Sequence, residues 1–370
     1  MPKKKILIIF NRYKFFGGEE AAFENEKRFY SKDYIVKTLE FSNDNLFNLI
    51  FSIFNPYAFF KTLFTIILFK PDIIYLNNLW YGASNSPVVA SFFARKATKK
   101  IKLHNFRLSC SKADHYLDNQ TCTKCSIKNK RYSYKFKCYK NSLFTTFLIN
   151  LYSNFQAKLI KSSLIDEVLV LNNLQKEILT KYGIKDKKIK IVKNVLTIRS
   201  DYAAEHNKSL KKNFLYVGRL EKEKGLLDLL DTWKSMNNKN EILKIIGDGS
   251  LREDVKKYAN DYNNIEYLGF LDHHLIENEI ANSKCLVFPT RLFEGQPTVI
   301  LEAMKIGIPV IAPNISFFET FDRKSYVSTY KLGDIQSFES LLRNFFDINF
   351  YEREKNNWRL FSDDFFKEVD

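Results

Sequence analysis

The sequence predicts an α/β protein built from two Rossmann-like, doubly wound domains that face a central cleft. Its length is the first indication, because 370 residues exceed what one hydrophobic core usually serves. The second is an alternation of short apolar runs with helix-length segments, which is typical of a parallel sheet covered by helices. The third is that this alternation lapses at residues 197–212 and then restarts.

The first half contains six expected strands and defines an N-terminal domain at residues 1–196. Each strand is a short run of apolar residues followed by an amphipathic segment. The polar residues 197–212 are interpreted as a linker. The strands are Ile6–Phe10, Tyr34–Leu39, Asp72–Leu76, Ile101–Leu103, Glu167–Leu171 and Lys188–Val192.

The second half repeats the pattern and defines a C-terminal domain at residues 213–350. Residues 351–370 are expected to form a helical segment that packs back toward the first domain. The expected strands are Phe214–Val217, Ile242–Ile246, Ile265–Leu268, Leu286–Phe288 and Ile308–Ile311, and the expected helices cover Gly225–Trp233, Leu251–Ala259 and Thr298–Lys305.

The formal net charge of +16 is compatible with nucleic acid, an anionic membrane or an anionic substrate as partner. It is also compatible with biased codon usage that has no functional meaning. The lysines are scattered and no nucleic-acid-binding motif is present, so nucleic acid is excluded. The run Ile6–Phe10 is too short for the core of a signal peptide. Polar residues interrupt the apolar stretch Leu46–Phe69, which argues against a membrane span and for a cytoplasmic protein.

Two loops of the second half suit an anionic ligand. Gly218 and Arg219 follow a strand, and Lys224 and Gly225 open a helix, so two cations meet a helix N-terminus. A solvated turn, in which neighbouring glutamates pair with these cations, is equally compatible. The later turn with Gly247 and Gly249 permits close backbone approach, although such turns are common between a strand and a helix.

The segment from Phe288 to Pro313 is the strongest signal. Glu294 lies in a loop with Gly295 and Gln296, Pro297 and Thr298 begin a helix, and Glu302 follows on its second turn. Two carboxylates that face one cleft suit the vicinal hydroxyls of a ribose or a sugar.

These three segments, in this order and spacing, resemble the retaining GT-B glycosyltransferases of family 4, the glycosyl transferases of group 1. The resemblance covers nearly the whole chain and implies metal-independent sugar transfer from a UDP- or GDP-sugar. It implies that Arg219 and Lys224 neutralise the departing diphosphate. It further implies that Glu302 holds the ribose and that Glu294, with the amides of residues 295–298, holds the sugar.

In the first half, Gly17 and Gly18 resemble the glycine loop of that family, although an ordinary turn fits as well. His104 ends a strand at the place of the family's cleft-facing histidine and is expected to contact the donor sugar or to position the acceptor hydroxyl. Asn105 and Arg107 follow as acceptor-side candidates, with Arg107 suited to an anionic acceptor group.

Four cysteines follow, with a central C-x-x-C pair. Their spacing is compatible with a structural zinc, which would stiffen an acceptor-side insert at about residues 105–140. Reduced thiols and disulfides are the alternatives. The cysteines are Cys110, Cys122, Cys125 and Cys138.

The expected function is therefore transfer of a sugar to a glycan or lipid-linked glycan in bacterial surface polysaccharide synthesis. The Phe-rich stretch Leu46–Phe69 is expected to form core helices or, alternatively, a surface for an anionic membrane. A sugar-nucleotide epimerase of the same architecture and an inactive nucleotide-sugar-binding homologue are the competing functions.

Overall fold

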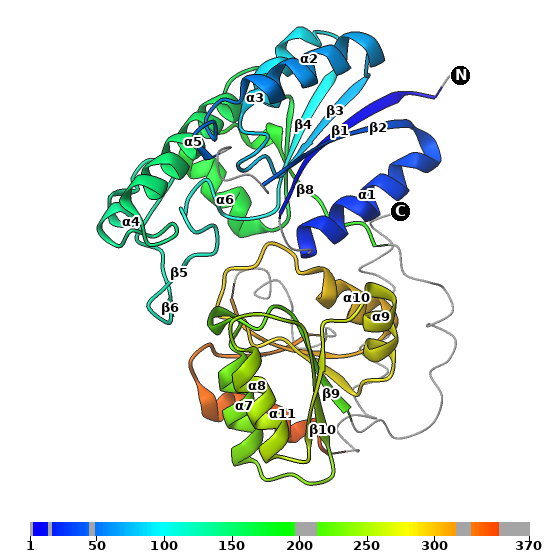
Figure 1. Ribbon diagram of the computed structural model, residues 1–370, viewed down its shortest axis with the longest axis vertical. Helices are drawn as coiled ribbons and strands as arrows, with labels where there is room; N and C mark the ends of the chain where they lie inside the picture. The colour runs from blue at the N-terminus through cyan, green and yellow to red at the C-terminus, as the bar shows by residue number, and fades with distance from the viewer. Residues whose placement is uncertain (1–2, 14–16, 44–48, 197–212, 316–326, 348–370) are drawn as a thin grey trace. The chain divides into compact units, whose positions relative to one another are not determined.

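The computed structural model describes residues 3–13, 17–43, 49–196, 213–315 and 327–347 (Figure 1). Internal contacts divide the chain into two units. The N-terminal unit comprises Met1–Leu117, Cys122–Thr197 and Phe293–Gln296, and the C-terminal unit comprises Asp118–Thr121, Ile198–Leu292 and Pro297–Asp370. The expected linker at residues 197–212 and the expected C-terminal segment at 351–370 lie outside the described residues.

The N-terminal unit is built on a six-stranded parallel sheet in the order β2-β1-β3-β4-β7-β8. All six strands were expected from the sequence, with ends that differ by up to three residues. They are β1 (Lys5–Arg12), β2 (Ile35–Ser42), β3 (Ile73–Asn77), β4 (Thr98–Leu103), β7 (Glu167–Val170) and β8 (Ile189–Ile191).

Helices connect these strands, and the cysteine-bearing insert follows β4. The insert contains the short strands β5 (Tyr116–Leu117) and β6 (Gln120–Thr121). The helices are α1 (Gly18–Asp33), α2 (Pro56–Phe69), α3 (Ser86–Ala90), η2 (Ser91–Phe93), α4 (Arg131–Lys135), α5 (Leu143–Lys161), α6 (Asn173–Tyr182) and η3 (Asp186–Lys188).

Strand β1 shows why its sequence is a continuous apolar run. Leu7 and Ile9 enter a core that also holds residues of α2, α5 and α6. The alternate residues enter a second core on the other face of the sheet, where Phe10 stacks on Phe23 of α1 with ring centroids 4.4 Å apart. A strand that is buried on both faces needs apolar residues at every position.

The C-terminal unit contains a second six-stranded parallel sheet in the order β11-β10-β9-β12-β13-β14. In sequence order this is 3-2-1-4-5-6, the strand order of dinucleotide-binding Rossmann folds. The strands are β9 (Asn213–Val217), β10 (Ile242–Ile246), β11 (Ile265–Gly269), β12 (Cys285–Val287), β13 (Val310–Pro313) and β14 (Val327–Tyr330).

The helices of this unit follow the expected pattern, and two Rossmann-like domains are thereby confirmed. Strand β14 and helices α9 and α11 were not named among the expected elements. The helices are η5 (Lys222–Lys224), α7 (Leu226–Ser235), α8 (Arg252–Asp261), α9 (His273–Ala281), α10 (Thr298–Ile306) and α11 (Ile335–Asn344). Within the described ranges, no helix combines the length and the apolar character that crossing a membrane requires.

Candidate functional site

In the C-terminal unit the strand order reverses between β9 and β12. Ligands of open α/β sheets bind at such a switch point, outside the carboxyl ends of the strands. The loops that follow β9 and β12 are the ones that carry Gly218–Gly225 and Pro289–Leu292. The sheet topology therefore places two of the motifs singled out in the sequence at this unit's expected ligand site.

Main-chain contacts hold the loops at this switch point together. The Leu220 amide donates to the Asp248 carbonyl over 3.0 Å, and the Leu251 amide donates to the Leu220 carbonyl over 2.9 Å. Gly247 has a φ of +144°, and a Cβ there would lie 1.9 Å from the Gly218 carbonyl oxygen. The Gly-Asp-Gly turn thus needs glycine to let two backbones meet.

The two predicted cations lie in the loop after β9. Arg219 is exposed and forms no ion pair with any residue that the structure describes. Glu221, which could have paired with it, instead accepts hydrogen bonds from the amide and hydroxyl of Ser250. Lys224 lies in η5, and its Nζ is 5.5 Å from the centre of the Phe288 ring. Arg219 can therefore receive an anion without first losing a carboxylate partner.

Glu302 lies on α10, which begins at Thr298 with Pro297 at its N-cap. The Glu302 carboxylate is buried, and Oε1 accepts from Nε2 of His273 over 3.0 Å. Its Oε2 makes no hydrogen bond to a described residue. The histidine fixes the orientation of the carboxylate and leaves one oxygen able to accept from a ligand hydroxyl.

The structure does not keep the two predicted glutamates in one unit, since Glu294 groups with the N-terminal unit. In that unit Asn172 Nδ2 donates to the carbonyl oxygens of Glu294 and Gly295 over 3.0 and 2.8 Å. Oε1 of Gln296 accepts from the Asn194 amide over 2.5 Å. These contacts fix the backbone of the segment.

In the N-terminal unit, His104 follows β4, and its Nε2 lies 3.0 Å from Asn77 Oδ1. Burial, and to a smaller extent the positive charge of Lys102, hold the pKa of His104 well below its ordinary value. The imidazole is therefore neutral at neutral pH. Asn77 Nδ2 donates in turn to Glu26 over 2.9 Å.

A buried charged network is connected to His104 through Asn77. Glu26 forms an ion pair with Lys102, and both side chains are at most 2% exposed. Glu26 also accepts from the Tyr75 hydroxyl over 3.2 Å, and Lys102 donates to Asn194 Oδ1 over 2.8 Å. The network positions Asn77 and, through it, His104.

The other predicted residues of this unit lie around the switch point between β1 and β3. Asn105 Nδ2 donates to Glu19 over 2.9 Å. Arg107 donates through Nη2 to the Tyr13 hydroxyl over 3.1 Å, whereas its Nη1 is buried and has no described partner. The Gly17 amide donates to Glu20 in the cap of α1, which Gly18 begins. In this conformation a phosphate would compete with Glu20 for that amide.

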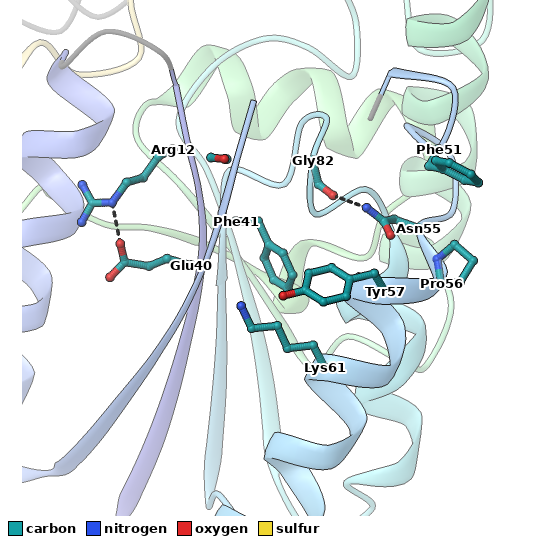
Figure 2. Close-up of a pocket in the computed structure, with 10 residues that line it drawn as sticks. Arg12, Glu40, Phe41, Phe51, Asn55, Pro56, Tyr57, Lys61 and Gly82 are labelled. Carbon is teal, nitrogen blue, oxygen red and sulfur yellow. Dashed lines mark hydrogen bonds and ion pairs between the residues drawn. The ribbon is translucent and has the colours of Figure 1, made fainter. Parts of the chain in front are cut away.

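A pocket of about 590 Å³ lies at the carboxyl ends of β1 and β2 (Figure 2). Arg12 lines it but is paired with Glu40 at 2.5 Å. Lys61 has no such partner among the described residues, and its Nζ lies 5.2 and 5.5 Å from the ring centres of Phe41 and Tyr57. The pocket thus combines aromatic walls with one ammonium group that is not paired with a carboxylate. Sequence reasoning did not identify it.

The four cysteines of the insert are free thiols, and they lie close enough for Cys138 to interact electrostatically with the other three. Burial and the charges of the other three raise the pKa of Cys138 to about 11. Burial lowers the pKa of Lys130 to about 7, and its buried Nζ has no hydrogen-bond partner among the described residues. An ammonium beside thiols would suit a negatively charged metal–thiolate centre. However, no three metal-binding side chains of the described chain are arranged to hold an ion, so the zinc site stays a prediction.

Reasoning from the sequence missed two further groups. His273 lies 29 positions before Glu302, and nothing in its local sequence marks it as a partner. Lys102 did carry a signal, because a charged residue inside an apolar strand requires a buried partner. That signal does not identify Glu26 or Asn194 as the partners of Lys102.

Two doubly wound parallel sheets in one chain, each with polar loops at its switch point, define the class of GT-B-type folds. Solved structures confirm this fold. Anabaena Alr3699/HepE in complex with UDP matches with a TM-score of 0.66 at 16% sequence identity, over 97% of this chain and 95% of that one.

The resemblance to the glycosyl transferases of group 1 is confirmed for part of the chain. Residues 199–323 match the sequence model of the family described as Glycosyl transferases group 1. The lipopolysaccharide 1,6-galactosyltransferase of Escherichia coli K12 is 28% identical, over 49% of this chain and 52% of its own length. The UDP-Gal:alpha-D-GlcNAc-diphosphoundecaprenol alpha-1,3-galactosyltransferase of E. coli is 31% identical, over 47% and 50%. The chain spans about half the length of the curated relatives it matches.

Proposed function

We propose that this protein is a retaining glycosyltransferase of bacterial surface polysaccharide synthesis. It transfers a sugar from a UDP- or GDP-sugar to a glycan or lipid-linked glycan. The observation that carries the proposal is the loop cluster at the β9/β12 switch point, where Arg219 has no ion-pair partner among the described residues. The names of the relatives, which include two galactosyltransferases, and the UDP complex of the structural neighbour support it.

The chemistry follows from the charge that develops on the leaving group. The bond between the anomeric carbon and the diphosphate oxygen breaks, and the diphosphate gains negative charge. Arg219 and Lys224 stabilise this charge more strongly in the transition state than in the bound donor, which lowers the barrier. The acceptor oxygen bonds to the same face of the anomeric carbon, and its proton passes to the departing diphosphate.

The remaining predicted residues bind and orient the substrates. Glu302, held by His273, accepts from the ribose hydroxyls. Glu294, the backbone of Gly295–Thr298 and the glycines of the loops hold the donor sugar and phosphates. The neutral His104 contacts the sugar or positions the acceptor hydroxyl, with Asn105 and Arg107 on the acceptor side.

Catalysis needs no metal ion in this proposal, because fixed cations perform the charge neutralisation that Mg²⁺ performs elsewhere. The sequence also contains no Asp-x-Asp motif suited to carrying such an ion.

The test is nucleotide binding by the full chain, measured by thermal shift and calorimetry with UDP, GDP and ADP, with and without EDTA. One nucleotide should raise the melting temperature, since it binds only folded protein, and EDTA should not change this. Arg219→Ala should weaken binding about 10- to 100-fold, because a charge-assisted hydrogen bond contributes about 1.5–3 kcal/mol. Glu302→Ala should also weaken it. Arg343→Ala, in α11 of the same unit, is the matched control. No binding of any nucleotide, or equal effects of the two arginine variants, would refute the donor site.

Incubation with donor sugars then separates the competing functions. A glycosyltransferase releases the nucleotide as it transfers or hydrolyses the sugar. An epimerase converts the donor without consuming an acceptor, and an inactive homologue binds nucleotide but leaves every donor intact.

A further inference from the structure

Helix α2 is apolar on the side that it turns away from its unit. It has 14 residues, of which Lys61 is the only charged one. Ala58, Thr62, Thr65 and Ile66 are buried. On the opposite side, at helical spacings of three and four, the exposed residues are Tyr57, Phe60, Phe64, Ile67 and Leu68.

The exposed apolar surface extends beyond the helix. Phe92 and Phe93 of η2 are more than half exposed, and the Phe93 ring lies 6.3 Å from that of Phe59 in α2. The name "α2 face" is used below for these two phenylalanines together with Tyr57, Phe60, Phe64, Ile67 and Leu68.

A surface helix normally presents polar residues to water, and a contiguous exposed apolar patch marks an interaction site. The length of α2 restricts what that site contacts. At about 1.5 Å per residue it reaches about 21 Å, which is short of the roughly 30 Å of a bilayer core. It can lie in the plane of a membrane interface, where aromatic side chains are favoured.

The charges around the α2 face identify the partner. Asp72 is the only acidic residue between positions 45 and 113. Lys70 at the C-cap of α2 is exposed, as are Arg95 and Lys96 immediately after η2. Basic residues that border an apolar helix face complement the negative surface potential of an anionic leaflet.

We propose that the α2 face docks on an anionic lipid bilayer. Tyr57 belongs both to this face and to the wall of the pocket, which also contains Lys61 (Figure 2). Docking therefore brings the pocket to the lipid surface, where it receives the phosphate of a lipid-linked acceptor. This second step rests on the proposed function, whereas docking itself does not.

The experiment is flotation of the full chain with vesicles of phosphatidylcholine, with or without 30% phosphatidylglycerol, in low salt. Wild type should float with the anionic vesicles and much less with the neutral ones, and 0.5 M salt should weaken binding. Phe64→Glu/Leu68→Glu should bind at least tenfold more weakly. Phe270→Glu is the matched control, since Phe270 is 63% exposed in the C-terminal unit against 60% for Phe64, and it should bind within twofold of wild type.

Failure of wild type to float, equal binding to neutral vesicles, or undiminished binding of the double variant would overturn the proposal. The docking proposal would also be overturned if the wild type self-associated and the double variant lost this self-association while floating as well as the wild type. Both α2 substitutions lie at exposed positions, and unchanged thermal unfolding verifies that the variants fold. The flotation assay contains no nucleotide or sugar, so it tests docking independently of the donor site. Protein that binds UDP but not vesicles would refute the docking proposal alone. Protein that binds vesicles but no nucleotide would refute the donor site alone.

Discussion

Replacing Lys102 with methionine should destabilise the N-terminal unit by about 3–5 kcal/mol. The substitution leaves the Glu26 carboxylate buried without its counter-ion, and this is the cost of breaking a buried ion pair from one side. Both side chains are at most 2% exposed, so water cannot replace the lost ammonium. A loss of this size is a large part of the roughly 5–15 kcal/mol that stabilises a typical domain.

The assay is native-state hydrogen exchange by mass spectrometry on peptides from β3 and β4, because two units need not unfold together. Lys100→Met is the control on the same strand. The Lys100 side chain is 28% exposed and pairs with Glu167 at 2.9 Å, so its loss should cost only about 0–1 kcal/mol. Adding Glu26→Gln to Lys102→Met removes the buried charge that has lost its counter-ion, and it should recover part of the lost free energy of unfolding. Equal costs for Lys100→Met and Lys102→Met, or no recovery in the double variant, would refute the reasoning.

Three further predictions address other parts of the chain. Gly225→Ala should lower the free energy of unfolding by about 3 kcal/mol and Gly333→Ala by about 1 kcal/mol. Both glycines have a positive φ, but of the two only Gly225 has a neighbour that an added Cβ would overlap. Equal falls in melting temperature for the two variants would contradict this. Burial lowers the pKa of His104 and His115 in the folded protein, so below about pH 6.5 the unfolded chain binds more protons than the folded one. The free energy of unfolding should therefore fall as the pH drops below about 6.5, by at most about 1.4 kcal/mol per pH unit for each histidine. His104→Gln should reduce this slope in urea titrations at pH 7.5 and 5.5, and an unchanged slope would exclude His104 as a source. The zinc prediction requires that purified protein contain about one equivalent of zinc by elemental analysis, and that Cys125→Ser lower this zinc content. Wild-type protein that is fully folded but free of metal would refute it.

The sequence predicted what depends on local pattern. A strand buried on both faces, such as Ile6–Phe10, must be apolar throughout and so identifies itself. Gly307 ends α10 with a positive φ, the conformation that glycine favours directly after a helix, and the expected end of this helix at Lys305 is one residue short of the observed end at Ile306. The loops after β9 and β10 were recognised because glycines and cations there follow apolar strands.

Features that depend on tertiary partners could not be predicted in this way. The pairing of Glu302 with His273 joins two helices that the chain connects only through β12 and its loops. The outward side of α2 is as apolar as its buried side, so periodicity does not separate a core helix from an exposed one. The pocket beside Lys61 likewise depends on β2 and α2 lying together.

The main-chain contacts among the loops at the β9/β12 switch point have a consequence for how this protein can diversify. Hydrogen bonds such as Leu220 to Asp248 join backbone atoms, so most side chains in these loops can be exchanged while the loops keep their shape. Positions such as Gly247, where two backbones meet, are closed to substitution, and Glu221 and Ser250 should be kept because their side chains join the loops after β9 and β10. A library that varies the other side chains and keeps these positions would therefore search for new ligand preferences on an unchanged backbone, which makes this unit a practical starting point for engineering.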